Sequence, residues 1–268
     1  MSDATSSEPV LLEVDGGVAT VTLNRPDAMN SLDVATKEAL RDVVVRLADD
    51  ADVRCVVLTA TGRAFCVGQD LKEHVELLEG GGSDALFRTV PEHYNPIVTA
   101  IATMPKPVIA AVNGVAAGAG ASLAFACDYR LLADSAGFNL AFSGIALSCD
   151  TGSSWTLPRL VGRAKAIELL YEPRTIGAEE ALELGLASRV VEGQTLMAEA
   201  RTLASRLAAG PTASYGAIRR SVAHAAGHTF EESLAFEAEM MTLTGSTEDH
   251  RNAVAAFVAK EKPTFHGR

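Results

Sequence analysis

The sequence predicts an α/β protein in which buried strands alternate with helices before the chain becomes helical. Two observations lead to this class. Strand, turn, helix and strand patterns repeat through the first half of the 268-residue chain, in the order that right-handed crossovers connect. After about residue 150, strand patterns become scarce and the spacing of the apolar residues indicates helices.

The first elements are a hairpin and an amphipathic helix. Residues 9–24 hold two β-rich runs around Asp15-Gly16-Gly17, which is a strong turn signal. Asp33 is a suitable N-cap for a helix over residues 34–49. The expected apolar face of this helix consists of Val34, Leu40, Val43, Val44 and Leu47.

The next segments alternate between strands and helices. Residues 61–83 are expected to form a loop, because Gly62, Gly68 and the run Gly80-Gly81-Gly82 interrupt them. A glycine-rich turn and a short apolar helix are expected after residue 113. The other expected elements are a strand over 53–60, a helix over 84–103 that Pro105 and Pro107 end, and strands over 107–113 and 129–134.

The C-terminal part is expected to be helical. A soft boundary near residue 205 divides a core, residues 1–205 with a disordered tail over 1–8, from a C-terminal helical region, residues 206–268. The expected helices after residue 160 cover 162–171, 178–186, 196–210, 212–226 and 230–243.

Composition excludes several classes of protein. Hydrophobic residues make up 48% of the chain, but no window is long and apolar enough to span a bilayer. The polar start, MSDATSSEP, lacks the features of a signal peptide, so we expect a cytoplasmic protein. Cys55, Cys66, Cys127 and Cys149 form no CxxC pair and are expected to be reduced thiols rather than metal ligands. The net charge of −11 argues against nucleic acid as a partner and leaves room for an anionic small molecule.

The stretch NGVAAGAGASLAFACD, residues 113–128, allows three chemical interpretations. A dinucleotide loop is poorly supported, because it would follow a late strand and no acidic residue stands about twenty positions further on. A nucleophilic Ser122 within GASLA is also poorly supported, because that serine falls inside the expected helix rather than at its start. In the third interpretation, backbone N–H groups at the helix start bind an anion such as a thioester enolate. The second donor would then come from AFCVGQDLKE, residues 64–73.

Five stretches in order resemble the enoyl-CoA hydratase/isomerase, or crotonase, family. They are VTLNRPDAMNSL, AFCVGQDLKE, PVIAAVNGVAAGAGASLAFACDYRLLAD, GSSWTLPRLVGRAKAIELLY with ALELGLASRVV, and AVAAFVAKEKPTF. The resemblance covers nearly the whole chain. It implies a spiral of ββα units, a C-terminal helical region that makes homotrimers or dimers of trimers, and acyl-CoA thioesters as substrates. Coenzyme A then enters with the substrate, and no metal or separate cofactor is expected.

The resemblance also implies roles for particular residues. The two oxyanion donors would be the backbone amides of Gln69 and Ala119, and Gly68 and Gly118 precede them. Ala replaces the Gly that many members carry at position 119, but the N–H group remains. The other expected substrate-binding residues are Ala28 and Met29 along the CoA, Asp70 in a mainly structural turn, Lys72 near the phosphates, and Phe257 and Lys260 from a neighbouring subunit. Lys72 has the alternative of being an ordinary solvated lysine.

This chain departs from the hydratases of the family at both catalytic glutamates. Ser122 and Phe142 occupy the two positions, and neither side chain can activate water or deliver a proton. Asp150, in ALSCDTGSSW, is the carboxylate that remains in this part of the sequence. The segment resembles that of members that isomerise ring-1,2-epoxyphenylacetyl-CoA, which carry an acid here. The alternative for Asp150 is a helix N-cap.

We therefore expect an enzyme that shifts a double bond of an acyl-CoA, with Asp150 as the only acid/base. The alternatives are an enoyl-CoA hydratase with atypical catalytic residues, and an acyl-CoA-binding member with little turnover. A scaffold protein built on the trimer is an alternative from another class.

Overall fold

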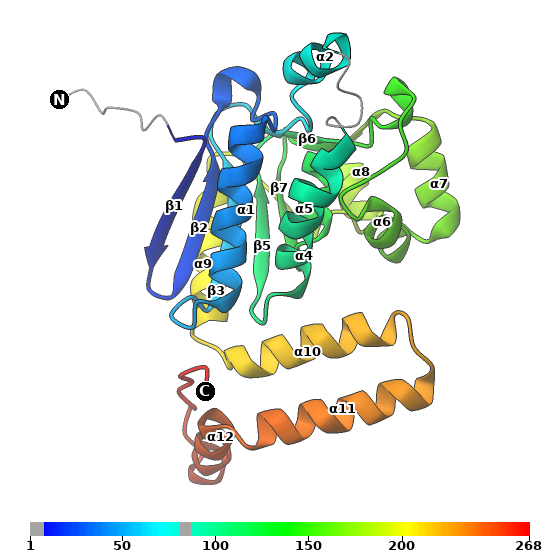
Figure 1. Cartoon of the computed structure of the whole chain (residues 1–268). Coiled ribbons are helices and arrows are strands. Elements are labelled where there is room, and N and C mark those ends of the chain that lie inside the picture. The colour runs from blue at the N-terminus through cyan, green and yellow to red at the C-terminus, as the bar shows by residue number, and fades with distance from the viewer. Residues whose placement is uncertain (1–7, 81–86) are drawn as a thin grey trace, which may run out of the picture.

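The computed structural model describes residues 8–80 and 87–268, and it confirms the α/β class (Figure 1). The large sheet has six strands, of which the first pair is antiparallel and all later pairs are parallel. In spatial order they are β1 (Val10–Asp15), β2 (Val18–Leu23), β3 (Cys55–Ala60), β5 (Val108–Val112), β7 (Tyr129–Ala133) and β10 (Arg189–Val191). The predicted hairpin is confirmed, and its turn places Gly16 and Gly17 at φ +54° and +77°. Except for Glu8, the predicted tail over 1–8 lies outside the described residues.

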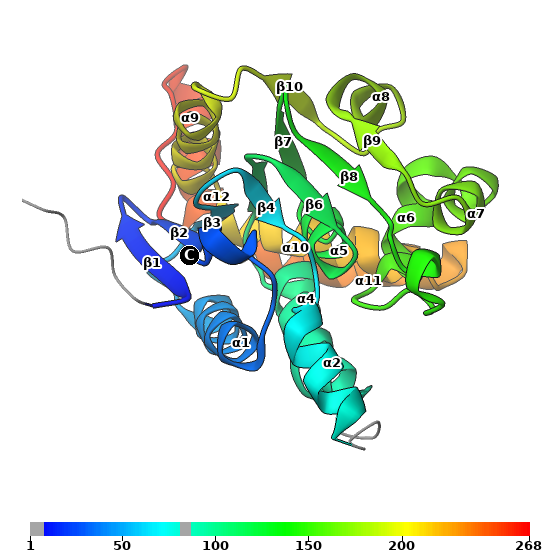
Figure 2. The same ribbon diagram turned by 90° about the horizontal axis from the view of Figure 1, so that it is seen from above.

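A second sheet of four strands lies beside the first (Figure 2). Its strands are β4 (Ala64–Cys66), β6 (Val115–Ala117), β8 (Gly137–Asn139) and β9 (Thr175–Gly177). The chain visits the two sheets alternately, because β3 is followed by β4, β5 by β6 and β7 by β8. This alternation is the spiral of the crotonase-like fold that the resemblance implied.

Helices cover both faces of the large sheet. α1 (Val34–Asp49) and α4 (Asn95–Thr103) lie on one face, and α9 (Leu196–Ala208) packs on the other (Figures 1 and 2). The inner side of α1 differs from the predicted face in two places. Val34 is 39% exposed, whereas Lys37 is buried in line with Leu40 and Val44.

The segment predicted to be a loop, residues 61–83, is not one. It contains the three-residue strand β4 and the helix α2 (Leu71–Glu79). The glycines concealed both elements, because Gly62 and Gly68 mark the turns on either side of β4. Gly81 and Gly82 lie outside the described residues.

Shorter helices complete the core. They are η1 (Pro26–Ala28), η2 (Val90–Tyr94), α5 (Ala119–Phe125), η3 (Ser143–Ile145), α6 (Ser153–Val161), α7 (Arg163–Tyr171) and α8 (Ala178–Glu183). Within the described residues, no helix is long and apolar enough to cross a membrane.

The C-terminal arm, residues 212–268, consists of three helices at the end of the molecule opposite α2 (Figure 1). They are α10 (Thr212–Ala225), α11 (Phe230–Gly245) and α12 (Glu248–Ala259). The boundary expected near residue 205 stays a prediction, and α9 runs through that position to Ala208.

One arginine joins the arm to the core. Arg219 of α10 forms an ion pair with Asp128 at 2.8 Å and donates hydrogen bonds to the carbonyl oxygens of Ile101, Met104 and Lys106. These carbonyl groups lie at and just after the C-terminal end of α4, where a cation is favoured. The contact therefore fixes the start of the arm on the core.

The four cysteines have free thiols, and three of them lie in the core. Burial raises the pKa of Cys55, Cys66 and Cys127 to about 12, so these groups remain uncharged thiols at neutral pH. Cys149 is half-buried.

Close packing of α5 against β4 depends on glycine. A Cβ at Gly120 would lie 2.1 Å from the carbonyl oxygen of Cys66, and one at Gly114 would lie 2.1 Å from that of Arg63. Both glycines are therefore needed because another backbone passes directly against them. This packing brings the start of α5 next to the end of β4.

Gly120→Ala should lower the free energy of unfolding by about 2 kcal/mol or more, because the added carbon forces the backbone of α5 away from β4. Unfolding in urea, followed by circular dichroism, measures the change. Gly177→Ala is the matched control, since no described atom lies within 4 Å of a Cβ built there. It should change stability by no more than about 0.5 kcal/mol. Equal losses in the two variants would contradict this account of the packing.

Candidate active site

Two backbone amides meet where β4 ends and α5 begins. Gly68 has a φ of +84°, and a Cβ there would lie 3.0 Å from the carbonyl oxygen of Ala117 and 3.4 Å from the amide nitrogen of Ala119. Among the described residues, neither Gln69 nor Ala119 donates its amide N–H to another backbone group. Ala119 is the first residue of α5, so its N–H has no partner within the helix. The predicted donors thus lie close together and are free to bind an anion.

Backbone pairing holds the Gln69 segment. Leu32 donates to the Gly68 carbonyl oxygen at 2.8 Å and accepts from the Asp70 amide at 3.2 Å, so that Leu32 and Gln69 form an isolated parallel bridge. The N–H of Gln69 lies between these two hydrogen bonds along the chain. The bridge therefore limits rotation of the peptide that carries the donor.

Asp70 has the structural role that we expected. Its carboxylate caps α2 by accepting from the amides of Lys72 and Glu73, and it also accepts from Ser31 and Arg25. Burial opposes ionisation, but these hydrogen bonds outweigh it and lower the pKa of Asp70. The residue stays charged and stabilises the turn beside Gln69.

Asp150 is a half-buried carboxylate in the loop before α6. Burial raises its pKa, while a hydrogen bond of 2.8 Å from the Thr151 hydroxyl lowers it, and burial is the larger effect. The alternative of a helix N-cap is wrong, because Gly152 occupies that position and no side chain caps α6. The carboxylate of Asp150 is thus left without a role in capping.

The structure connects Asp150 to both amides through neighbouring residues. Its carbonyl oxygen accepts from the Ser153 amide, and the Ser153 hydroxyl forms a hydrogen bond with Ser122, one turn into α5 from Ala119. Burial raises the pKa of Tyr94 well above its usual value, and the charge of Asp150 raises it further. Tyr94 itself donates to the side chain of Gln69 at 2.6 Å.

Backbone strain accompanies this loop. Thr151 is a buried, β-branched residue with a φ of +51°, and Gly152 follows it at +80°. A β-branched residue in this region is an outlier that costs on the order of 1 kcal/mol or more. In this strained turn the Thr151 hydroxyl donates a hydrogen bond to the Asp150 carboxylate.

The side chains of Ser122 and Phe142 are both buried. The Ser122 hydroxyl donates to the Gly118 carbonyl oxygen at 3.0 Å and also forms a hydrogen bond with the Ser153 hydroxyl. No histidine among the described residues is its partner, so the nucleophile interpretation gains no support. A Cβ at Gly118 would lie 4.0 Å from the Phe142 ring, which places this ring beside the second donor.

The residues expected to contact CoA lie in two separate places. Ala28 ends η1, and Met29 follows it in a left-handed turn with a φ of +52°. Lys72 is exposed in the first turn of α2. Phe257, which is 83% exposed, and Lys260 belong to α12 and its end, so within one chain they lie at the end of the molecule opposite α2 (Figure 1).

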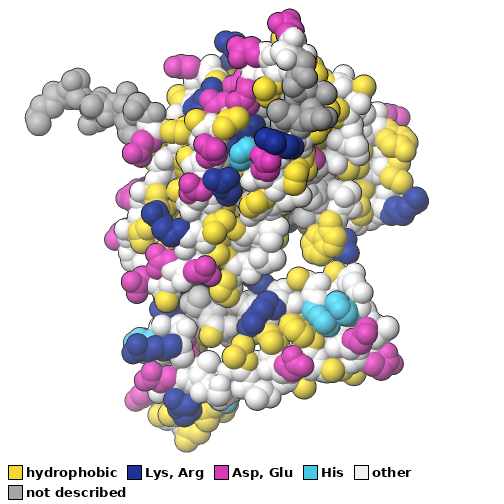
Figure 3. Space-filling view, viewed as in Figure 1, with side chains coloured by type: hydrophobic (Ala, Val, Ile, Leu, Met, Phe, Trp, Pro, Cys, Tyr) yellow, Lys and Arg dark blue, Asp and Glu magenta, His cyan; other side chains and the backbone are white. Residues whose placement is uncertain are grey.

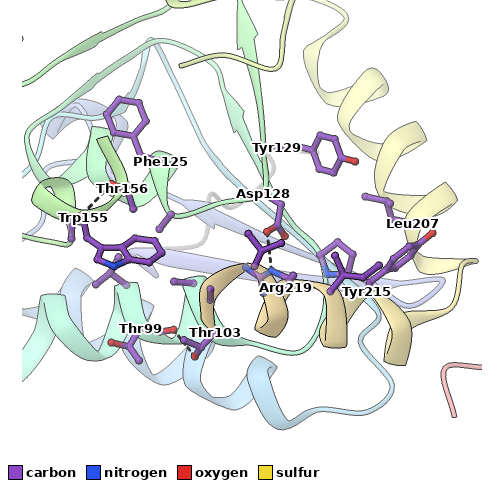
Figure 4. Close-up of a pocket in the computed structure, with 18 residues that line it drawn as sticks. Thr99, Thr103, Phe125, Asp128, Tyr129, Trp155, Thr156, Leu207, Tyr215 and Arg219 are labelled. Atoms are coloured by element: carbon purple, nitrogen blue, oxygen red, sulfur yellow. Dashed lines mark hydrogen bonds and ion pairs between the residues drawn. The ribbon is translucent and has the colours of Figure 1, made fainter. Parts of the chain in front are cut away.

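A large cavity lies away from the two amides. It measures about 600 Å³ and opens where the surface is hollowed between the core and α10 (Figure 3). Its wall includes Trp155 and the ion pair of Asp128 with Arg219 (Figure 4). Neither predicted donor lines this cavity, and its wall is mostly apolar. We therefore locate the candidate site at the two amides, whose N–H groups are free donors.

Three residues near the site were missed in the sequence. Lys37 and Tyr94 contact the side chain of Gln69, and Thr151 contacts Asp150. The spacing of Lys37 to Leu40 and Val44 places it on the inner face of α1 and could have revealed it. No sequence signal marks Tyr94 or Thr151.

The sequence matches the enoyl-CoA hydratase/isomerase family over residues 13–268. The chain belongs to this family, as the resemblance of its motifs implied.

Relatives of this chain carry both names of the family. The chain is 41% identical to the 1,2-epoxyphenylacetyl-CoA isomerase of Escherichia coli, over 97% of this chain and 99% of the relative. It is 34% identical to the short-chain-enoyl-CoA hydratase of Clostridium acetobutylicum, over 94% of this chain and 95% of the relative. The crystal structure of an enoyl-CoA hydratase from Bacillus anthracis is similar with a TM-score of 0.91 at 30% identity, covering 97% of this chain and 100% of that chain.

Asp150→Asn should stabilise the protein at pH 7. Above both pKa values the carboxylate is charged in the folded and unfolded states, and burial penalises only the folded one; below its ordinary value of 3.8 it is protonated in both. The gain should therefore be complete at neutral pH and disappear as the pH falls through the raised pKa and then through 3.8. Thermal unfolding measures it as a rise of about 2 to 4 °C for each kcal/mol gained. A variant that melts lower than the wild type at pH 7 would contradict the burial of a charged Asp150.

Proposed function

We propose that this chain is an acyl-CoA isomerase that shifts a double bond relative to the thioester carbonyl. The observation that carries the proposal is a half-buried carboxylate of raised pKa, Asp150, whose backbone is linked through Ser153 and Ser122 to the helix that Ala119 begins. The positions of the usual glutamates hold Ser122 and Phe142. One acid/base is enough for a 1,3-proton shift, whereas hydration needs water to be activated as well.

In the proposed reaction Asp150 moves one proton between two carbons. Its carboxylate takes a proton from the α carbon of a 3-enoyl-CoA, and the electron pair of that bond delocalises onto the thioester oxygen. The amides of Gln69 and Ala119 donate to this oxygen and stabilise the enolate. The protonated Asp150 then returns the proton to the γ carbon, which leaves the double bond next to the carbonyl. No net charge or atom is gained or lost.

The buried environment suits Asp150 to this role. A carboxyl group whose pKa is raised is a stronger base than an ordinary one and can still release the proton. The Phe142 ring beside Gly118 would exclude water from the enolate. The Ser122 hydroxyl supports the same conclusion, because it donates its proton to the Gly118 carbonyl oxygen and a serine hydroxyl is not an acid/base near neutral pH.

The substrate would be held along the surface near α2. In this proposal Ala28 and Met29 contact the CoA, and Lys72 attracts its phosphates. Phe257 and Lys260 would reach the CoA from a neighbouring subunit, since their own chain holds them at the other end of the molecule. The exposed apolar side chains of the arm support a homotrimer or a dimer of trimers.

Asp150→Asn should abolish the isomerisation while acyl-CoA binding persists. NMR of a 3-enoyl-CoA in D2O with the wild type should show a shifted double bond and deuterium at the α and γ carbons. The variant should lose this exchange by about 1000-fold or more, because a proton carrier is removed. Asp52→Asn, an exposed carboxylate in the loop before β3, is the matched control and should exchange at the wild-type rate.

Other products would identify the alternatives. A 3-hydroxyacyl product would show hydration by atypical residues. Binding of the CoA thioester without exchange in the wild type would show an acyl-CoA-binding member, and an absence of binding would favour a scaffold.

A further inference from the structure

A buried lysine lies behind the first oxyanion donor. Lys37, in the second turn of α1, is 1% exposed, and its ammonium group has three hydrogen-bond partners. They are the Gln69 side-chain oxygen at 3.2 Å, a carboxylate oxygen of Glu73 at 3.3 Å and the Thr89 hydroxyl at 2.9 Å. A buried ammonium group is costly unless such partners surround it. The three partners come from different segments, so Lys37 joins α1 to the start of α2 and to the helical residue directly before η2.

The side chain of Gln69 is fixed at both ends of its amide. The oxygen accepts from Lys37 and also from the Tyr94 hydroxyl at 2.6 Å, and the nitrogen donates to Glu73 at 3.1 Å. Burial raises the pKa of Tyr94, so its hydroxyl remains a donor at neutral pH. The Glu73 carboxylate in turn accepts from the Val34 amide at 2.9 Å. Two of the three polar groups around Gln69, Lys37 and Glu73, are thus held by further partners.

This arrangement has a consequence for the backbone of Gln69. Its side chain points into the cluster of Lys37, Glu73 and Tyr94, and its own N–H is the free donor. A residue whose side chain is fixed on one side and whose neighbours pair with Leu32 has little freedom to rotate its peptide. Oxyanion donors work because they are held in place before the charge develops.

We propose that Lys37 is a positioning residue of the oxyanion hole, which holds the Gln69 amide in the orientation that receives the thioester oxygen. The proposal rests on the proposed function, since it assumes that this amide binds the substrate carbonyl. Lys37 touches no reacting atom in it. Removing the ammonium group leaves Gln69 with the Tyr94 bond alone on its oxygen and leaves the Glu73 carboxylate without its cation.

Lys37→Met keeps the apolar length of the side chain and removes the charge. Lys106→Met is the matched control, because Lys106 is also buried and its ammonium group also holds α1, through the carbonyl oxygens of Leu47 and Asp50. Ten residues of helix separate Lys37 from Leu47, which is about 15 Å. Both variants lose a buried cation, but only the first lies at the candidate site.

Two readouts separate positioning from general destabilisation. The first is the exchange rate of the α proton with D2O, for which Lys37→Met should lower kcat by about 10- to 100-fold with a smaller change in KM. The second is the infrared stretch of a 2-enoyl-CoA with ¹³C at the thioester carbonyl, since hydrogen bonds to this oxygen lower its frequency. Bound to the wild type the band should shift down, and Lys37→Met should reduce the shift while Lys106→Met retains it.

Each result decides between the two proposals. A wild-type protein that leaves the carbonyl band unshifted would overturn the proposed function and with it the role of Lys37. A full shift and unchanged kcat in Lys37→Met would overturn the role of Lys37 alone. If Lys37→Met does not fold, Tyr94→Phe removes a single hydrogen bond from the same Gln69 oxygen and keeps the ring. A reduced shift in that variant supports positioning through the Gln69 side chain, and an unchanged shift refutes it.

Discussion

The contact between α5 and β4 is the constraint on which the candidate site depends. Gly120 lacks a side chain, so the first turn of α5 lies directly against the Cys66 carbonyl group. Because β4 ends two residues before Gly68, the same contact brings the turn at Gly68 against the start of the helix. Each of these two segments contributes only one of the two free amide N–H groups. The site exists only because a strand of one turn of the spiral and a helix of the next touch without side chains between them.

Several features that are unfavourable for stability lie near this contact. A lysine is buried beneath α2, a carboxylate is half-buried before α6, and Thr151 holds a left-handed conformation. Such features cost stability unless other contacts compensate for them. All three lie within one or two contacts of Gln69 or Asp150, although buried charges also occur elsewhere, as at Lys106 and Arg130. The concentration of costs at one place is what a working site in a stable fold is expected to show.

The sequence predicted the elements with strong local signals. The hairpin, α1, the buried strands and most C-terminal helices follow from periodicity and turn residues, and the two proposed donors follow from the family motifs. It did not predict β4, because a three-residue strand has no periodicity and glycines surround it. Lys37 was missed for another reason: a charged residue on an apolar face looks like an interruption until its partners from Gln69, Glu73 and Thr89 are known. Those partners are distant in sequence, so tertiary contacts alone reveal them.

Ala119 shows a further property of a site built from main-chain groups. Its contribution is an N–H group that every residue except proline possesses, so the anion-binding part does not depend on which side chain stands there. The proton-moving part that we propose does depend on a side chain, that of Asp150, which stands outside α5 in the loop before α6. The two parts can therefore change independently during evolution. A lineage can exchange one chemistry for another by replacing a few side chains around an unaltered scaffold, and the same separation would let a designer install new acids and bases here.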